Sequence, residues 1–360
     1  MSGGFTGNPG DEPSVDVHAH ALLPRIEAMV AGSPALDRRR QVELRCQGQE
    51  SAEVSVRMVR ERIPSLVDAE VRLADMARTG IDVQLVSVTP AQFHYWAGPD
   101  QAMDLSQAVN EGIAAHCAQR PGQLAGLGVV PLQHPELAVA ALEHAVRDCG
   151  LKGVEISTYA PDPTGDGLIE LSDPRLEPLW QRAQELEALI FLHPFGCELG
   201  TRLDRWNLAN TIGQPLEHAI ALSHLIFAGV LDRHPALRLL AAHGGGYLPA
   251  YLGRGDHAWR VRPDAATCER PPSSYPRDVH VDSLVHSPTQ LRSLVDQLGS
   301  DRVLLGTDHP FDMGEPDPLG QLKAAALSPE QQRDVASGNA RRLNLLPTPA
   351  SPPRKEHDRA

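Results

Sequence analysis

The stretch Val15-Asp-Val-His18-Ala-His20 reads as a short apolar strand that ends in two histidines one residue apart. Side chains i and i+2 of a strand point to the same side, so both imidazoles can bind one ion. A single His-x-His pair is weak evidence for a site. However, three later apolar runs also end in polar residues of the metal-binding type, namely Phe191-Leu-His193-Pro, Ala241-Ala-His243-Gly and Leu305-Gly-Thr-Asp308.

Eight β-like runs alternate with helix-like segments along the chain. Several of the runs are apolar without alternation, as in parallel strands that are covered on both faces. Eight β-α units in this order predict an α/β fold of the (β/α)8 TIM-barrel type rather than an open sheet. The runs lie at residues 14–18, 81–88, 124–130, 152–157, 189–193, 237–243, 278–283 and 302–307, and the helix-like segments at 66–78, 104–120, 135–149, 175–186, 215–233, 248–260, 289–298 and 321–343.

The predicted barrel covers residues 14–346. Tails at 1–13 and 347–360 are rich in Pro, Gly and charged residues and are predicted to be disordered. An insertion at 21–65 is too long for an ordinary βα loop, and it predicts a lid or a small subdomain over the face of the barrel that carries the strand ends. Within the insertion, alternation over Glu53–Glu61 predicts a short hairpin strand.

Charge and cysteine content limit the class of protein. Lys plus Arg number 33 and Asp plus Glu number 46, so the acidic balance argues against nucleic acid or an anionic membrane as partner. The five cysteines are scattered without a C-x-x-C pair, and no apolar run approaches about 20 residues. With no signal pattern at the start, the sequence predicts a cytoplasmic protein.

The C-terminal ends of all barrel strands lie on one face, where catalytic groups gather. We therefore predict that His18, His20, His193 and Asp308 bind one divalent ion, and this set of three nitrogens and one oxygen suits zinc. Asp308 could instead cap a following helix. His243 remains as a general acid or base, with a structural histidine or a ligand of a second metal as alternatives.

Longer motifs around these residues resemble the amidohydrolase superfamily, and more closely its amidohydrolase-2, metal-dependent decarboxylase branch. The resemblance spans almost the whole chain between the predicted tails. It rests on Val15–His20, Phe93-His-Tyr-Trp-Ala97, Gly126-Leu-Gly-Val-Val-Pro131, His193-Pro, Ala242-His-Gly-Gly-Gly246 and Leu305-Gly-Thr-Asp-His-Pro-Phe311.

This resemblance implies a (β/α)8 fold, a divalent metal that is usually zinc, with manganese as the alternative, and His243 beside it as the acid–base catalyst. It also implies an arginine in a short insertion strand that holds the substrate carboxylate; Arg57 matches that context, and Arg60 cannot be told apart from it. A second arginine, Arg254, would reach the neighbouring site in a homodimer. Either arginine could instead be solvated.

Three residues depart from the pattern that the resemblance predicts. Asn210 stands where an aromatic residue is expected, His309 where tyrosine is expected and Glu155 where glutamine is expected. A carboxylate on the fourth strand bridges the two metals in two-metal members of the superfamily, so Glu155 raises the question of a second ion. These differences favour a different, still carboxylated, substrate.

The expected function is a carbon–carbon lyase that decarboxylates a small unsaturated or aromatic carboxylic acid. Tyr95 and Trp96 could form walls of its pocket or could simply pack beneath the lid. No organic cofactor is expected, because a conjugated substrate can itself accept the electrons. One alternative is a metal-dependent hydrolase of an amide, lactone or C–C bond, in which Asp308 would shuttle the proton; the other is a barrel without catalysis.

Overall fold

The computed structural model describes residues 12–165 and 167–347. The tails predicted at 1–13 and 347–360 fall outside these residues except for their innermost positions. The strands are β1 (Val15–Ala21), β2 (Val83–Val88), β3 (Leu124–Gly126), β4 (Gly128–Val129), β5 (Gly153–Ile156), β6 (Tyr159–Pro161), β7 (Leu168–Glu170), β8 (Leu189–Leu192), β9 (Arg238–Ala241), β10 (His280–Asp282) and β11 (Val303–Leu304).

The parallel strands form a closed barrel. β1 pairs with β2 and β2 with β3, while β4, β5, β8, β9, β10 and β11 pair in that order. β3 and β4 act as one strand, because only Leu127 separates them and its N–H donates to Val86 O at 2.9 Å. The last strand returns to the first: Val17 N–H donates to Leu305 O at 2.9 Å, and Asp308 N–H donates to His18 O at 2.8 Å. The predicted eight-stranded barrel is therefore confirmed.

A buried carboxylate strengthens the junction between the first and last strands. Asp16 accepts hydrogen bonds from the backbone N–H of Thr307 at 3.0 Å and from its hydroxyl at 2.7 Å. Gln84 Nε2 donates to the same carboxylate at 2.9 Å. Burial raises the pKa of Asp16 to about 6, although these hydrogen bonds oppose the rise.

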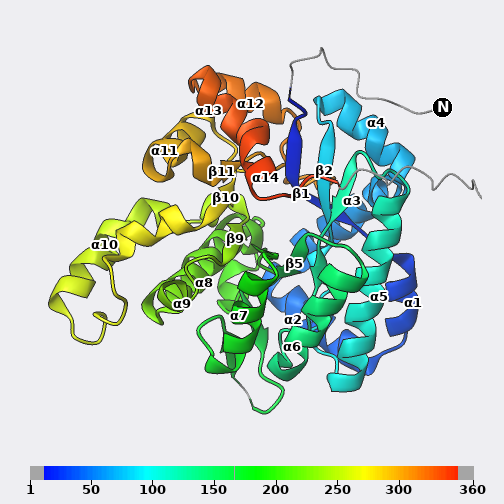
Figure 1. The fold of residues 1–360 in the computed structure, drawn as a ribbon. Helices are drawn as coiled ribbons and strands as arrows, with labels where there is room; N and C mark the ends of the chain where they lie inside the picture. The colour runs from blue at the N-terminus through cyan, green and yellow to red at the C-terminus, as the bar shows by residue number, and fades with distance from the viewer. Residues whose placement is uncertain (1–11, 166, 348–360) are drawn as a thin grey trace, which may run out of the picture.

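Helices surround the barrel (Figure 1). Proline stands in the first turn of α5, α6 and α11, where its missing N–H has no intrahelical partner to lose. The helices are α1 (Pro24–Val30), α2 (Pro34–Gln47), α3 (Gln49–Val67), α4 (Ala69–Thr79), α5 (Pro99–Ala118), α6 (Pro135–Glu143), α7 (Glu177–Glu185), α8 (Gln214–Phe227), α9 (Val230–Arg233), α10 (Leu248–Val261), α11 (Pro288–Leu298), α12 (Pro318–Ala324), α13 (Pro329–Arg333) and α14 (Asn339–Arg342).

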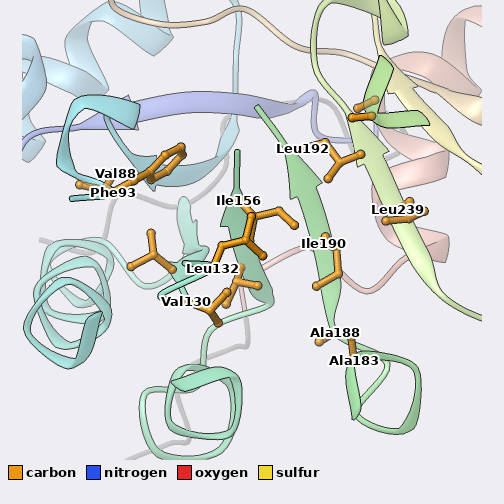
Figure 2. Close-up of a cluster of buried hydrophobic side chains, with 14 of the residues drawn as sticks. Val88, Phe93, Val130, Leu132, Ile156, Ala183, Ala188, Ile190, Leu192 and Leu239 are labelled. Carbon is orange, nitrogen blue, oxygen red and sulfur yellow. The ribbon is translucent and has the colours of Figure 1, made fainter. Parts of the chain in front are cut away.

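In strands such as β8 and β9, alternate residues belong to two different apolar clusters. On β8, Leu189 and Phe191 pack in the smaller cluster inside the barrel, whereas Ile190 and Leu192 pack in the larger cluster between the barrel and the helices. Figure 2 shows part of this outer cluster, with Ile156, Ile190 and Leu239 on neighbouring strands. Burial on both faces explains why these strands read as continuous apolar runs.

A β-bulge in β1 turns its histidines into the barrel. Strict alternation from the inward Val15 and Val17 would point His18 toward the helices. Between Asp16 and Ala19, however, β1 contains one residue more than the facing part of β2. This extra residue reverses the alternation, so His18 and His20 face inward above the apolar interior.

The insertion differs from the prediction. The segment expected to form a short strand, Glu53–Glu61, lies inside the long helix α3, so that prediction is wrong. Val54 and Val56, whose spacing suggested a strand, are both exposed on this helix. Helices α1 and α2 form the rest of the insertion. Among the described residues, no helix is both long and apolar enough to cross a membrane.

Candidate metal centre

Four side chains converge at the C-terminal end of the barrel. His18 and His20 come from β1, His193 follows β8 and Asp308 follows β11, and their donor atoms all lie within 4.8 Å of one another. The two Nε2 atoms of His18 and His20 are 3.1 Å apart. Asp308 Oδ1 is 3.4 Å from the first of these nitrogens and 3.2 Å from the second. All four residues are buried.

The protein holds the other ring nitrogen of each histidine. His18 Nδ1 lies 2.7 Å from Asp282 Oδ2, His20 Nδ1 lies 3.2 Å from Val88 O, and His193 Nδ1 lies 3.0 Å from Pro194 O. An acceptor at Nδ1 fixes the proton there and directs the free Nε2 toward the centre of the cluster. Each imidazole is thus oriented as a metal ligand.

The cluster fits a divalent ion. His193 Nε2 and Asp308 Oδ1 are buried without a hydrogen-bond partner in the described part of the chain. Buried polar atoms without partners are costly, and an ion between them would remove that cost. The alternative in which Asp308 caps a helix is wrong, because the next helix, α12, begins at Pro318 and is capped by Asp317. A metal-binding site is therefore present.

Asp282 extends the centre beyond the predicted ligands. Its Oδ1 accepts hydrogen bonds from Gly244 N–H at 2.9 Å and from Leu284 N–H at 3.1 Å. Burial raises the pKa of Asp282, but the hydrogen bond and charge of His18 outweigh this and lower it, so the group is a carboxylate. Asp282 ends β10, within the predicted strand at 278–283, so the strand-end argument could have identified it.

His243 lies beside the cluster. Its ring centroid is 5.0 Å from that of His193 and 5.4 Å from that of His18. Its Nδ1 lies 3.2 Å from Nε2 of His218, a buried residue of α8. Burial and the neighbouring His18 lower the pKa of His243 to about 4.

A tight turn after β9 gives His243 this position. His243 has a φ of 53°, and the three glycines that follow it also have positive φ. A Cβ on Gly246 would lie 2.1 Å from Pro215 O, so only glycine fits there. The triple glycine therefore places His243 close to α8. Sequence reasoning missed the contact with His218, because a histidine inside an amphipathic helix carries no pattern of its own.

Glu155 is near the cluster but outside it. It lies on β5, fully buried, with Oε1 3.9 Å from Nδ1 of His20. His20 uses its opposite nitrogen, Nε2, toward Asp308. Burial raises the pKa of Glu155 well above its usual range. The structure therefore places Glu155 on the far side of the His20 ring from the four-residue cluster.

A cavity of about 210 Å³ lies next to the strand ends that carry the ligands. Phe195, two residues after His193, lines it, and so do Tyr95 and Trp96, which follow β2. From the insertion, α2 contributes Arg39 and Arg40. The cavity thus lies between α2 and the face that carries the metal-binding cluster.

The two predicted substrate arginines lie elsewhere. Arg57 is exposed on helix α3 rather than on a strand, and it does not line the cavity; Arg60 is exposed on the same helix. Arg254 is exposed on α10, where it lines a second cavity of about 340 Å³ between α8 and α10. The structure does not bring any of the three to the metal-binding cluster.

The remaining departures from the expected pattern are not at the metal centre either. His309 points to α4, with Nε2 3.0 Å from Asp75 Oδ2 and Nδ1 3.3 Å from Arg72. Asn210 Nδ2 donates to Gln214 Oε1 at 3.3 Å, one helical turn away. His309 therefore belongs to the hydrogen-bond network between the last strand and α4 rather than to a substrate pocket.

Comparisons with known proteins agree with this geometry. A family model described as amidohydrolase matches residues 15–343. The chain is 35% identical over 277 residues to 2-amino-3-carboxymuconate-6-semialdehyde decarboxylase of Dictyostelium discoideum, covering 76% of this chain and 75% of the relative. It is 30% identical over 254 residues to gamma-resorcylate decarboxylase of Rhodococcus jostii, covering 68% and 77%.

A solved structure shares the fold. The 5-carboxyvanillate decarboxylase of Novosphingobium aromaticivorans, in complex with manganese and 4-hydroxy-3-methoxy-5-nitrobenzoic acid, superposes with a TM-score of 0.77 and 21% identity, covering 94% of this chain and 97% of that one. The family match includes His18, His20, His193, His243 and Asp308. The chain belongs to the amidohydrolase family.

Proposed function

We propose that this chain is a metal-dependent, non-oxidative decarboxylase, a carbon–carbon lyase that acts on small unsaturated or aromatic carboxylic acids. The observation that carries the proposal is the position of His243, whose ring lies 5.0 Å from that of His193 in the metal-binding cluster and is held from behind by His218. The curated relatives named above are themselves decarboxylases.

A divalent ion held by His18, His20, His193 and Asp308 would supply positive charge to a substrate oxygen next to the scissile carboxylate. In the reaction the C–C bond breaks, CO₂ leaves, and the electron pair stays on the ring or chain carbon. The neutral His243 ring takes a proton from water and delivers it to that carbon, forming the C–H bond, and the hydroxide that is left combines with CO₂ as bicarbonate. Nε2 of His218 lies 3.2 Å from Nδ1 of His243 and keeps the His243 ring in place, and Trp96 forms a wall of the cavity.

Zinc is the ion that we propose, with manganese as the alternative. Three imidazole nitrogens and one carboxylate oxygen suit zinc. Manganese occupies the related 5-carboxyvanillate decarboxylase. Elemental analysis of the purified protein, followed by removal of the metal and reconstitution with each ion, will identify the one that restores CO₂ release.

The reaction itself is tested with a His243→Asn variant, because asparagine tolerates the positive φ at this position. Metal-loaded wild type should release CO₂ from 2-hydroxybenzoate-type acids. The variant should keep its metal content and lose turnover by at least about 100-fold. Cleavage of an amide or lactone into two fragments or a ring-opened product, without CO₂, would instead support a hydrolase.

We also propose a homodimer in which Arg254 reaches the site of the neighbouring chain. Helix α10, which carries Arg254, extends away from the strands (Figure 1) and has no buried residue along its length. Tyr251 on this helix is 71% exposed, as expected of a surface that a partner would cover.

All five cysteines are free, which supports a cytoplasmic location.

Mixed dimers test the role of Arg254. Arg254→Ala and His243→Asn variants, each inactive alone, should regain part of the activity when they are denatured and refolded together. Recovery is expected because one of the two shared sites would then contain both residues. Absence of recovery in dimers shown to be mixed by mass spectrometry would remove Arg254 from the site.

A further inference from the structure

A fully buried arginine of α4, Arg72, holds the base of the insertion. Its Nη2 donates to the backbone oxygen of His20 and, at 3.2 Å, to that of Ser65. His20 directly precedes the insertion at 21–65 and Ser65 is its last residue, so one nitrogen binds both of its ends. Because His20 also belongs to the metal-binding cluster, Arg72 connects the insertion to the backbone of that cluster.

The other terminal nitrogen of Arg72 reaches the end of the last strand. Nη1 donates to Gln84 Oε1 at 3.0 Å and lies 3.3 Å from Nδ1 of His309. A guanidinium cannot accept, so Nδ1 of His309 is the acceptor and the ring proton is on Nε2, 3.0 Å from Asp75 Oδ2. Asp75 lies three residues after Arg72, on the same face of α4. Two side chains of one helix therefore hold His309, the residue next to the ligand Asp308.

The hydrogen bonds continue from Gln84 to the other ligand of β1. Nε2 of Gln84 donates to Asp16 at 2.9 Å. The carboxylate of Asp16 accepts from the backbone N–H of His18 at 3.0 Å and from that of Thr307 at 3.0 Å. Thr307 directly precedes Asp308. The network that starts at α4 therefore contacts the backbone at or beside three of the four residues of the metal-binding cluster.

The shape of the arginine side chain explains these contacts. The two terminal nitrogens of Arg72 carry four N–H groups and face four acceptors, whereas its Nε has no partner among the described residues. A lysine has a single nitrogen on a flexible chain, so it would keep the charge but not this set of contacts. Charge and geometry can therefore be tested separately at this position.

We propose that Arg72 is a positioning residue of the metal centre, which fixes the backbone of the ligand-bearing strand ends from outside the barrel. It contacts two of these segments directly and a third through Gln84 and Asp16. The ligands then keep their mutual distances even where the insertion begins, directly after His20. The inference concerns binding of the ion, so it goes beyond the proposed reaction and applies equally to a lyase and to a hydrolase.

Metal affinity and the spectrum of bound Co²⁺ test the proposal, and neither requires a substrate. In Arg72→Lys the dissociation constant for zinc should rise by about tenfold, at the lower end of the effect of an outer partner. The visible absorption bands of the Co²⁺-loaded protein report coordination geometry and should shift. The matched control is Arg78→Gln: Arg78 is exposed on the same helix and pairs with the other oxygen of Asp75. This control should keep the constant and the bands of wild type.

A second variant covers the case in which Arg72→Lys does not fold. His309→Leu removes one acceptor of Arg72 at a side chain that is 15% exposed. It should shift the Co²⁺ bands and raise the zinc constant by about fivefold, the worth of one hydrogen bond. His309→Asn offers an oxygen in place of Nδ1 and should lie closer to wild type.

Thermal unfolding of the metal-free proteins separates positioning from stability. If Arg72 only stabilised the fold, the folded variants would unfold at lower temperature but would keep the zinc constant and the Co²⁺ bands of wild type. That result in Arg72→Lys, or in His309→Leu where the first variant does not fold, would overturn the proposal. Weaker zinc binding and shifted bands, with Arg78→Gln unchanged, would support it.

Discussion

The metal-binding cluster and the cavity beside α2 differ in whether their buried polar atoms have hydrogen-bond partners in the protein. In the cluster, each of the three histidines has its Nδ1 held by an acceptor of the protein, and its Nε2 is directed toward the other ligands. In the cavity wall, neither nitrogen of His94 has a partner among the described residues. The protein itself orients the ligands of the cluster, whereas it supplies no partner for His94 within the described residues.

This difference indicates how stability and function are divided. Oriented ligands bind an ion with little loss of side-chain freedom, so we expect the geometry of the centre to withstand changes elsewhere. Buried groups without partners destabilise the free protein and favour binding of whatever satisfies them. Changing a metal ligand or the group that orients it should therefore weaken metal binding. Replacing a buried group without a partner should stabilise the chain, for His94 at acidic pH.

The largest effect is expected when a ligand is changed. Asp308→Asn keeps the size and the positive φ of the residue but removes the charge that faces His18 and His20. Metal affinity should fall by more than the roughly 10–100-fold typical of an outer partner, and CO₂ release should fall with it. Elemental analysis after dialysis measures the first effect. Asp312→Ala, an exposed position in the same loop, should retain a full complement of metal.

A change at Asp282, which contacts a ligand and not the ion, should have a smaller effect on metal binding. Asp282→Asn weakens the acceptor of His18 Nδ1, while its amide oxygen can still accept from Gly244 N–H. The metal dissociation constant should rise by about 10–100-fold, because outer partners orient the ligand and increase its basicity. Competition with a chromophoric chelator gives this number. An unchanged constant would show that the orientation of His18 does not depend on Asp282.

The cavity wall should respond through pH. Since the folded state lowers the pKa of His94 from 6.5 to about 4, the unfolded chain takes up the proton first, and stability is lost as pH falls through this window. His94→Asn removes this loss and tolerates the positive φ at this position. Between pH 7 and pH 5 the variant should gain about 2 kcal/mol relative to wild type. Urea unfolding of both proteins at pH 7 and pH 5 measures this gain. If the difference in unfolding free energy between variant and wild type did not change with pH, burial of His94 would not be its cause.

The smallest effect should come from Arg57. Because Arg57 is exposed on α3 and away from the cavity, Arg57→Gln should change stability by less than about 0.5 kcal/mol and kcat/KM by less than about twofold. A large rise in KM would restore the role that the sequence suggested for it. The measurement is a comparison of initial rates with the same acid.

The sequence predicted the ligands well because each one ends an apolar run. Continuous runs such as that of β8 require burial on both faces, and this property is visible in the letters alone. The inward direction of the His18 side chain could not be predicted in the same way. It depends on the bulge between Asp16 and Ala19, and no residue pattern in the sequence indicates that bulge. The metal-binding cluster was therefore predictable in composition, but the reason for its geometry was not.

The insertion was harder to predict because its pattern supports two structures. Val54, Val56 and Met58 alternate with polar residues, as in a strand, but the surrounding Glu, Arg and Gln residues favour a helix. Exposure of Val54 and Val56 shows that no sheet needed this alternation. The contact between His218 and His243 joins a helix to a distant strand end, which short sequence windows do not contain.

The junction between β1 and the last strand has a further consequence for folding. His18 and His20 lie on the first strand and Asp308 follows the last one, so an ion bound to these three residues would connect the first strand to the last. Any ligand that binds only the closed form stabilises it by mass action. The midpoint of thermal unfolding should therefore rise with free metal concentration, and the resident ion would act as a cross-link that keeps the barrel shut.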